Sequence, residues 1–261
     1  MPKPRIVCII PARYGSTRLP GKPLIEIHGR PMILHILHRA ARIPEVERIV
    51  VATDDERIRS CVARAGGEAF LTDPSHPSGT DRIAEVARRL GLHDEDVVVN
   101  VQGDQPLLDP GPVNAIVARL LADIDTPMTT PACPLSPAEA KNPNRVKVVV
   151  DRSWRALYFS RARIPFDRDG IWEDVRADGA LPSDLRAVYL RHIGLYAYRQ
   201  GFLQAFVGLP PGLLEEVERL EQLRALENGF PIGVVPVSSA PPEVDTPEDL
   251  DVVRGLCGRE A

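Results

Sequence analysis

The sequence has few aromatic residues and no excess of positive charge. Phe, Trp and Tyr make up 5% of the chain, and the formal net charge at pH 7 is -4. Proteins whose main task is to bind nucleic acids usually carry a basic face, and those that bind single strands also stack the bases on aromatic rings. We therefore expect no nucleic-acid partner.

Long apolar runs are also missing. No stretch approaches the roughly 18 apolar residues that a membrane-spanning helix requires. The apolar run Ile6–Ile10 near the N-terminus is too short for a signal peptide and leads directly into a basic segment. We therefore expect no membrane segment and a cytoplasmic location.

The four cysteines are far apart and form no C-x-x-C pair. They are Cys8, Cys61, Cys133 and Cys257. Closely spaced cysteines are typical of zinc sites and of small disulfide frameworks, and this chain has neither pattern. We expect reduced cysteines that act as small hydrophobic side chains.

The order of apolar segments predicts an α/β fold. Strands are expected at Ile6–Ile10, Arg48–Thr53 and Glu68–Leu71, with amphipathic helices after Pro31 and after Asp55. Strands that alternate with helices at this spacing form βαβ units and a parallel sheet. A chain of 261 residues can form one large α/β domain, with or without a smaller lobe.

The segment from Pro11 to Pro23 follows the first strand and is basic. Glycines and prolines exclude an ordinary helix or strand here, and Arg13, Arg18 and Lys22 supply positive charge. Such a loop at the carboxyl end of a strand can surround a polyphosphate. The spacing is not that of a P-loop or of a dinucleotide-binding turn. A basic surface loop is the alternative.

Two further loops carry polar residues where a strand ends or a helix begins. Ser78–Thr80 precedes a helix expected over 81–90, whose free N–H groups could contact a base or a phosphate, or serve only as a cap. The apolar strand Asp96–Val101 leads into Gln102–Pro106, where Asp104 is a candidate ligand for Mg²⁺. The alternative for Asp104 is an ordinary Gly-Asp turn.

The second half of the chain is expected to contain further strands and helices. The expected elements are a helix at 110–122, a strand at 128–133, a hairpin of 146–150 with 156–160, an irregular segment at 161–188, a strand at 189–198, helices at 200–206 and 213–228, a strand at 232–237 and a final helix capped by Thr246.

With these motifs in hand, the chain resembles the 3-deoxy-manno-octulosonate (KDO) cytidylyltransferases, the CMP-KDO synthetases of Gram-negative envelope synthesis. The resemblance covers nearly the whole length. Its motifs are IIPARYGSTRLPGKP at 9–23, SGTDR at 78–82, NVQGD at 100–104, NPNRVKVV at 142–149, YFSRA at 158–162, RHIGLYAY at 191–198, LEQLR at 220–224 and VDTPEDL at 244–250. One departure is Gln105, where the family often has Glu after the Asp of Q-G-D.

The resemblance implies a role for specific residues of this chain. For the CTP phosphates they are Arg13, Ser16 and Lys22, and for cytosine and ribose they are Ser78, Gly79, Arg82 and Gln102. The implied Mg²⁺ ligands are Asp104 and Asp245, and the implied contacts to the sugar acid are Arg161, His192, Tyr196, Glu218 and Gln222. Core packing is an alternative for His192 and Tyr196, and a solvated helix face is an alternative for Glu218 and Gln222.

The resemblance also implies a fold and a reaction. The fold is a Rossmann-like, mostly parallel sheet flanked by helices, of the nucleotide-diphospho-sugar transferase type, with a sugar-binding and dimerisation lobe at approximately 155–212. A homodimer is implied, with 189–198 as the suggested contact. In the reaction, the anomeric hydroxyl of the sugar acid attacks the α-phosphorus of CTP and pyrophosphate leaves. Lys22, Arg13, Asp104 and Asp245 would carry the catalysis, with Mg²⁺ as cofactor, and no side chain need act as a strong general base.

Other functions remain open from the sequence. Within enzymes, the acceptor could be an 8-amino analogue of KDO or another acid sugar such as a sialic acid. A uridylyl- or guanylyltransferase would share the first loop but not the late motifs. An alternative of another class is a nucleotide-binding regulator without catalysis, which would release no pyrophosphate.

Overall fold

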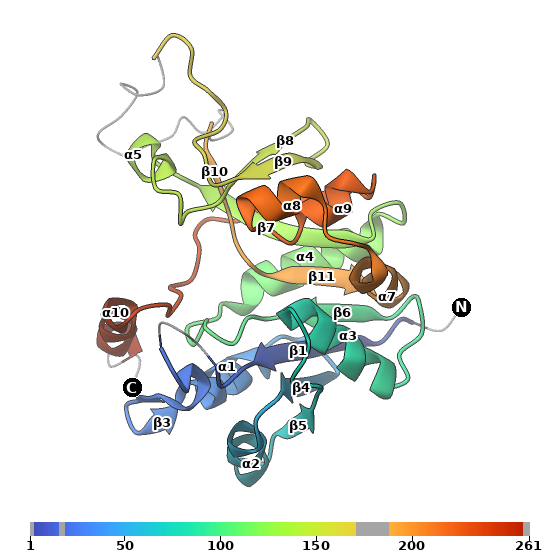
Figure 1. Cartoon of the computed structure of the whole chain (residues 1–261), viewed down its shortest axis with the longest axis vertical. Helices are drawn as coiled ribbons and strands as arrows, with labels where there is room; N and C mark the ends of the chain where they lie inside the picture. The colour runs from blue at the N-terminus through green and yellow to red at the C-terminus, as the bar shows by residue number, and fades with distance from the viewer. Residues whose placement is uncertain (1–2, 16–18, 171–187, 258–261) are drawn as a thin grey trace.

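A ten-stranded mixed sheet forms the centre of the molecule (Figure 1). The computed structural model describes residues 3–15, 19–170 and 188–257. The strand order is β5-β4-β1-β6-β11-β7-β10-β8-β9, and β12 pairs with the other edge of β7. The chain therefore builds its first half and its second half into one continuous sheet.

The first half of the chain forms the parallel part of this sheet. Its strands are β1 (Ile6–Ala12), β4 (Arg48–Thr53), β5 (Glu68–Leu71) and β6 (Val97–Asn100). The neighbours β5 and β4, β4 and β1, and β1 and β6 are all parallel. Helices cover both faces, which is why β1 is apolar throughout, β6 is apolar up to its last residue, Asn100, and both strands are buried. The predicted α/β fold with a mostly parallel core is confirmed.

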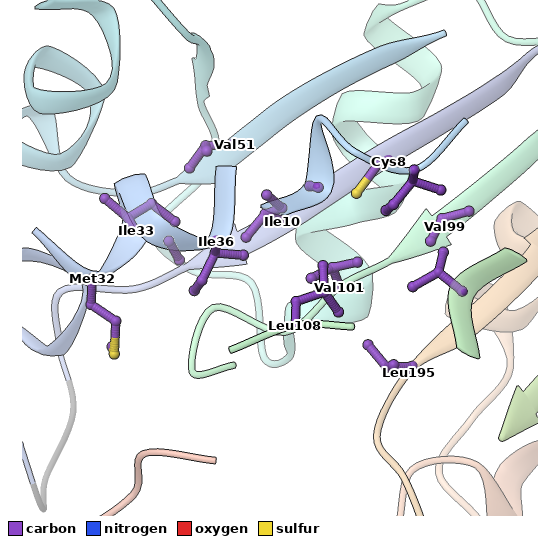
Figure 2. Close-up of a cluster of buried hydrophobic side chains, with 14 of the residues drawn as sticks. Cys8, Ile10, Met32, Ile33, Ile36, Val51, Val99, Val101, Leu108 and Leu195 are labelled. Atoms are coloured by element: carbon purple, nitrogen blue, oxygen red, sulfur yellow. The ribbon is translucent and has the colours of Figure 1, made fainter. Parts of the chain in front are cut away.

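Helices on the two faces of the sheet form two separate hydrophobic cores. One face packs against α1 (Met32–Ala40), α2 (Glu56–Arg64) and α4 (Pro110–Ala122), and the other against α3 (Gly79–Arg89) and α7 (Gln200–Gly208). Figure 2 shows Ile33 and Ile36 of the first core beside Ile10 of β1. Alternate residues of β1 point to opposite faces, so this strand contributes to both cores.

The second half of the chain adds strands that are mostly antiparallel. They are β7 (Met128–Pro134), β8 (Lys147–Val150), β9 (Ala156–Ser160), β10 (Leu190–His192), β11 (Tyr196–Arg199) and β12 (Ile232–Pro236). The hairpin expected in this region is present as the antiparallel pair β8 and β9. The strand β11 lies between β6 and β7 and joins the two halves of the sheet.

The single strand expected at 189–198 is wrong, because residues 193–195 interrupt it. β10 pairs with β7 and β8, whereas β11 pairs with β7 and β6. At the interruption, the carbonyl groups of Ile193 and Leu195 accept from the side-chain hydroxyl of Thr130 in the neighbouring β7. Both strands are paired along both edges, so neither edge is free to pair with a second chain.

The single helix expected at 213–228 is also wrong. The segment forms two short helices, α8 (Leu213–Glu218) and α9 (Leu223–Glu227). Arg219 has a φ of 54°, in the left-handed region, and this conformation ends α8. Periodicity did not reveal the break, because apolar residues continue at helical spacing through it.

The remaining described elements are short, apart from the C-terminal helix. They are η1 (Lys22–Leu24), β2 (Glu26–Ile27), β3 (Arg30–Pro31), α5 (Pro137–Ala140) and α10 (Pro247–Cys257). Among the described residues, no helix has the length and apolar character needed to cross a membrane. As expected, no cysteine forms a disulfide with another described residue, and Cys8, Cys61 and Cys133 are buried.

The residues of the expected lobe at 155–212 lie in two places. β9 and β10 belong to the far end of the sheet, whereas β11 and α7 belong to its centre, where α7 contacts α3. Residues 171–187, which fall in the expected irregular segment 161–188, lie outside the described residues. The roles of this region in sugar binding and in dimerisation stay predictions.

Candidate active site

The basic loop after β1 folds back to place Lys22 beside the carboxyl end of the sheet. The backbone N–H of Gly21 donates to the carbonyl of Tyr14 at 3.0 Å and closes the loop. Gly21 has a φ of 69°, which a glycine adopts without strain. The guanidinium of Arg57 stacks on the Tyr14 ring, 3.4 Å from its centroid. Arg13 is exposed and forms no side-chain hydrogen bond with the described part of the chain.

Lys22 lies between two carboxylates that are far apart in the sequence. Its Nζ is 3.2 Å from Asp104 Oδ2 and 3.2 Å from Asp245 Oδ1, and it also donates to the carbonyl of Val244 at 2.9 Å. The N–H of Val244 in turn donates to the carbonyl of Asp104 at 2.9 Å, which holds the two segments together. The structure thus brings together three of the four residues to which the resemblance gives a catalytic role.

Burial and charge both act on the carboxylates of this cluster. Burial raises the pKa of Asp104 above its ordinary value, and the neighbouring Asp245 raises it further, while Lys22 opposes both effects. A cation between the two carboxylates reduces their mutual repulsion. The donor set also fits Mg²⁺, which prefers one or two carboxylates completed by water and substrate phosphate oxygens.

A close approach of two backbones determines where Asp104 and Gln102 lie. A Cβ atom added to Gly103 would lie 2.6 Å from the carbonyl oxygen of Pro11. Only glycine therefore lets the loop after β6 pass this close to the end of β1. Gln102, on one side of Gly103, donates to Asn100 Oδ1 at 3.2 Å.

The N-terminus of α3 faces the same edge of the sheet. Ser78 caps the helix, and its Oγ accepts from the N–H groups of Thr80 and Asp81. A Cβ on Gly79 would lie 3.4 Å from Pro11, so this turn packs tightly against β1. The predicted cap is confirmed, while the part that Ser78 and Gly79 play in CTP binding stays a prediction.

Arg82 is buried, whereas Arg13 is exposed. The Arg82 side chain forms an ion pair with Asp54 at 2.9 Å and donates to the hydroxyl of Thr72. It therefore ties α3 to the segments that follow β4 and β5. The role of Arg82 in CTP binding stays a prediction, as does that of Ser16, which lies outside the described residues.

A polar cavity of about 410 Å³ opens beside Asp104. The residues expected to contact the sugar that line it are Gln222, Tyr196, His192 and Arg161, and Gln102 and Asp104 line it too. Gln222 is 5% exposed, and its Nε2 is buried with no hydrogen-bond partner among the described residues. A buried donor without a partner is costly, so this amide is suited to a polar ligand in the cavity.

His192 is at once a packed and a cavity-lining residue. Its ring makes an edge contact with Phe159, at 5.0 Å between centroids, and a tilted contact with Tyr196 at 5.5 Å. Burial and the positive charge of Arg191 lower the pKa of His192 to about 3, so the ring is neutral near pH 7. Packing and cavity lining are therefore both true of this side chain.

Glu218 lies outside the cavity lining and holds a residue that lines it. Its carboxylate accepts from the hydroxyl of Ser160 and from the N–H of Arg161 at 2.9 Å. The guanidinium of Arg161 donates to the carbonyl of Glu218 at 2.8 Å and to those of Pro143 and Arg219. Glu218 thus positions Arg161, and its expected direct contact with the sugar stays a prediction.

A second cavity of about 680 Å³ adjoins the first and shares Arg161, Arg191 and Glu243 with it. Arg191 forms an ion pair with Glu243 at 3.3 Å. Gln105, at the position where the family often has Glu, is buried and donates to Glu243 at 3.4 Å. Burial and the nearby Asp104 and Asp245 raise the pKa of Glu243.

Sequence reasoning missed several residues that line these cavities, among them Arg191, Glu243 and Glu221. Glu221 accepts from Thr80, and its Oε1 is buried with no hydrogen bond to the part of the chain that the structure describes. Its place in the L-E-Q-L-R motif, next to Gln222, was a usable signal. Nothing local marks Glu243, because only the approach of its loop to Gln105 and Arg191 brings it into the site.

Comparisons with known proteins identify the family of this chain. The profile of the family described as cytidylyltransferase matches residues 7–235. A 3-deoxy-manno-octulosonate cytidylyltransferase of Syntrophobacter fumaroxidans is 52% identical over 260 residues, covering 98% of this chain and of that protein. The protein of the same name from Aeromonas salmonicida is 50% identical over 256 residues, covering 96% of this chain and 98% of that protein.

A solved structure shows the same overall arrangement. It is described as CMP:2-keto-3-deoxy-manno-octonic acid synthetase complexed with CTP, and it is 42% identical with a TM-score of 0.89, covering 98% of this chain and all of that one. The mixed sheet agrees with this overall likeness. The chain therefore belongs to the cytidylyltransferase family.

Proposed function

We propose that this protein transfers CMP from CTP to 3-deoxy-manno-octulosonate and releases pyrophosphate. The observation that carries the proposal is the meeting of Lys22, Asp104 and Asp245 beside a polar cavity that Gln222 and His192 line. The names of the relatives that are about half identical over nearly the whole chain support it. The product for the cell would be an activated sugar for lipopolysaccharide synthesis.

In this proposal the basic loop and the start of α3 bind CTP. Arg13, Ser16 and Lys22 contact the phosphates, since Arg13 is exposed next to β1 and Lys22 lies at the carboxylate cluster. Ser78, Gly79, Arg82 and Gln102 form the cytosine and ribose pocket. Arg82 contributes by holding the Asp54 segment, which its ion pair already does in the free protein.

Asp104 and Asp245 are the proposed ligands of Mg²⁺. A bound Mg²⁺ ion would neutralise charge at the α-phosphate and increase the acidity of the attacking hydroxyl. Among the described residues no group of three or more His, Cys, Asp or Glu side chains could hold a metal. Two carboxylates leave several coordination positions for phosphate oxygens and water, as Mg²⁺ in nucleotide sites usually requires.

The cavity beside Asp104 is the proposed site of the sugar acid. Arg161 and Arg191 would attract its carboxylate, since both line the cavity and carry positive charge. His192, Tyr196 and Gln222 would contact its hydroxyl groups, and Glu218 would keep Arg161 in place. This arrangement would hold the anomeric hydroxyl near Asp104, at the edge of the phosphate site.

The protein's own contribution to the reaction is then positioning and charge. An anionic acceptor must approach a polyanion, and the cations of this site reduce that repulsion. Lys22 and Arg13 would stabilise the negative charge that develops on the leaving pyrophosphate. None of these steps requires a side chain that acts as a strong general base.

The first test is pyrophosphate release from CTP, measured with and without KDO and in Mg²⁺ or EDTA. Release that requires both the sugar and the metal is the expected result. If pyrophosphate were released with an 8-amino analogue or a sialic acid but not with KDO, that sugar would be the acceptor instead of KDO. If CTP bound but no acid sugar caused pyrophosphate release, the protein would be a nucleotide-binding regulator rather than a transferase.

The substitution Asp104→Asn tests the metal assignment in the same assay. We expect turnover to fall by about 100-fold or more, because the metal loses a charged ligand. The fold should persist, because the substitution conserves shape and removes a repulsion with Asp245. Thermal unfolding monitors the fold, and Asp251→Asn on the exposed face of α10 is the control. Turnover like that of the wild type would contradict the assignment.

A homodimer in the cytoplasm completes the proposal. Light scattering during size-exclusion chromatography measures the mass of the particle, and twice 28.7 kDa is the expected value. Because β10 and β11 are interior strands, we expect the contact surface to lie elsewhere than along their edges. A single-chain mass at micromolar concentration would contradict the dimer without affecting the reaction.

A further inference from the structure

The hydroxyl group of Thr130 in β7 has one proton to donate but lies within hydrogen-bond distance of three partners. The Thr130 side chain is fully buried. Its Oγ1 is 2.8 Å from the carbonyl oxygen of Leu195, 3.1 Å from that of Ile193 and 3.0 Å from Nε2 of His192. Thr130 lies where β10 ends and β11 begins. Its partners are therefore the last residue of β10, His192, and two residues of the interruption, Ile193 and Leu195.

The positions of the protons follow from the chemistry of these partners. Carbonyl oxygens can only accept, so the Thr130 hydroxyl must donate its single proton toward Leu195 and Ile193. Its oxygen is then an acceptor for the remaining partner, and Nε2 of His192 must carry a proton to donate to it. The opposite tautomer would leave the hydroxyl donating to the ring and the Leu195 carbonyl facing an oxygen without a proton, which is unfavourable for a buried group, whereas the Ile193 carbonyl still accepts from the N–H of Leu195.

The tautomer has a consequence at the other ring nitrogen. In a neutral imidazole with its proton on Nε2, Nδ1 is a hydrogen-bond acceptor. His192 lines the cavity of about 410 Å³, and the one hydrogen bond of its ring to the described residues is that to Thr130. Contacts with Phe159 and Tyr196 hold the plane of the ring. The ring of this lining residue therefore carries an acceptor in a fixed orientation.

We propose that Thr130 is a positioning residue, which holds His192 with its proton on Nε2 so that Nδ1 accepts a hydrogen bond from a hydroxyl group of the sugar acid. The identity of this ligand rests on the proposed function. The interaction selects a donor at one position of the acceptor sugar, because a carbonyl or ether oxygen there would face the lone pair of Nδ1. Thr130 acts only through His192 and does not itself line the cavity.

The tautomer can be read in the free protein without any reaction. Two-dimensional NMR of the ¹⁵N-histidine-labelled wild type distinguishes a protonated Nε2 from a protonated Nδ1, and the His192→Gln variant identifies the signal. The expected signature is protonated Nε2 with an unprotonated Nδ1 at pH 7. A proton on Nδ1 would overturn the proposal whatever the variants do.

Kinetic variants test the consequence for the sugar. Thr130→Val keeps the shape and removes the hydroxyl, and we expect the KM for the sugar acid to rise about tenfold while the KM for CTP stays unchanged. Thr130→Ser restores the hydroxyl and should return the KM close to that of the wild type. Thr129→Val is the matched control, because the buried Thr129 hydroxyl donates to Ile116 and not to His192.

Two further variants keep the test decisive if Thr130→Val does not fold. His192→Asn places an amide oxygen near the position of Nδ1, whereas His192→Gln reaches toward the position of Nε2. We expect the KM for the sugar to stay lower in His192→Asn than in His192→Gln, and the reverse order would overturn the acceptor role.

The outcomes also separate this inference from the proposed function. A changed tautomer in Thr130→Val with an unchanged KM for the sugar would overturn the role of Nδ1. A wild type that shows the expected tautomer but no turnover with any acid sugar would instead count against the transferase.

Discussion

At the scale of single residues, Lys22 contacts both carboxylates that we propose as ligands of Mg²⁺. Its ammonium group is 3.2 Å from an oxygen of each carboxylate. In the free protein it therefore neutralises part of the charge that a metal would otherwise attract. When CTP binds, its phosphates offer Lys22 another anionic partner, which would leave both carboxylates to the metal.

Replacing Lys22 by Met should strengthen metal binding in the absence of nucleotide. Removal of a positive charge this close to both ligands should tighten Mn²⁺ binding to the free protein by at least about tenfold. Titration calorimetry or the electron paramagnetic resonance of free Mn²⁺ measures the change. Catalysis should be lost at the same time, because Lys22 no longer contacts the phosphates.

Lys3→Met, on an exposed side chain, is the control for this effect. Weaker or unchanged Mn²⁺ binding by Lys22→Met would show that Lys22 does not compete with the metal.

His192 makes stability depend on pH. Burial lowers its pKa to about 3, from an ordinary value of 6.5, so the unfolded chain binds a proton in a range where the folded protein does not. The stability is fully present above pH 6.5 and decreases as the pH falls toward 3. At pH 5 the cost is about 2 kcal/mol of the free energy of unfolding.

The substitution His192→Gln should remove this dependence. Urea unfolding at pH 7 and at pH 5 measures the difference in the free energy of unfolding, which should be smaller in the variant than in the wild type. His93→Gln, an exposed histidine, should behave as the wild type does. An equal loss between pH 7 and pH 5 in both His192→Gln and the wild type would contradict the lowered pKa.

At the scale of elements, the ends of β1 and β6 meet through Gly103. A Cβ atom at position 103 would lie only 2.6 Å from the carbonyl oxygen of Pro11, which is too close for any residue other than glycine. Gln102 and Asp104 flank this glycine, so the spacing of two strands determines the positions of two site residues. The Q-G-D motif thus has a packing reason in addition to its chemistry.

Gly103→Ala should consequently affect both stability and activity. We expect a loss of about 1–3 kcal/mol in the free energy of unfolding, because a backbone contact cannot give way as a flexible side chain can. Turnover should fall further than stability alone would explain, since Asp104 moves away from Asp245. Denaturant unfolding and pyrophosphate release measure the two effects.

Gly208→Ala, in the last turn of α7 with nothing within 4 Å of the added Cβ, is the matched control. It should leave activity unchanged and keep or raise stability. If Gly103→Ala matched this control, the close approach would not matter.

At the scale of the whole molecule, the site joins segments from both halves of the chain. Lys22 comes from the first loop, Asp104 from the centre of the sheet and Asp245 from the segment before α10. Binding at such a place should stabilise the entire fold. At a ligand concentration of 100 times Kd, the gain is about 2.7 kcal/mol.

CTP with Mg²⁺ should therefore raise Tm by about 5–10 °C. Differential scanning calorimetry measures this shift, and EDTA should reduce it, because the carboxylates then repel the phosphates. UTP with Mg²⁺ is the control for the base. A shift that is as large in EDTA as in Mg²⁺ would contradict a site in which metal and nucleotide bind together.

The sequence by itself determined the parallel half of the sheet and the ends of several helices. Continuous apolar runs predict β1, β4 and β6, and Asp55 and Ser78 cap helices as expected. These features depend on neighbouring residues, which is why local patterns reveal them. The motifs that carry the resemblance also imply a catalytic role for Lys22, Asp104 and Asp245.

Only the tertiary structure decided how these residues meet. The interruption between β10 and β11 depends on the Thr130 hydroxyl of another strand, and Glu243 enters the site through contacts with Gln105 and Arg191. The placement of Lys22 between two carboxylates depends on a loop closing across the sheet. Such contacts join residues that are distant in the chain. Local sequence patterns cannot predict them, because their free energy comes from burial and charge in the folded state.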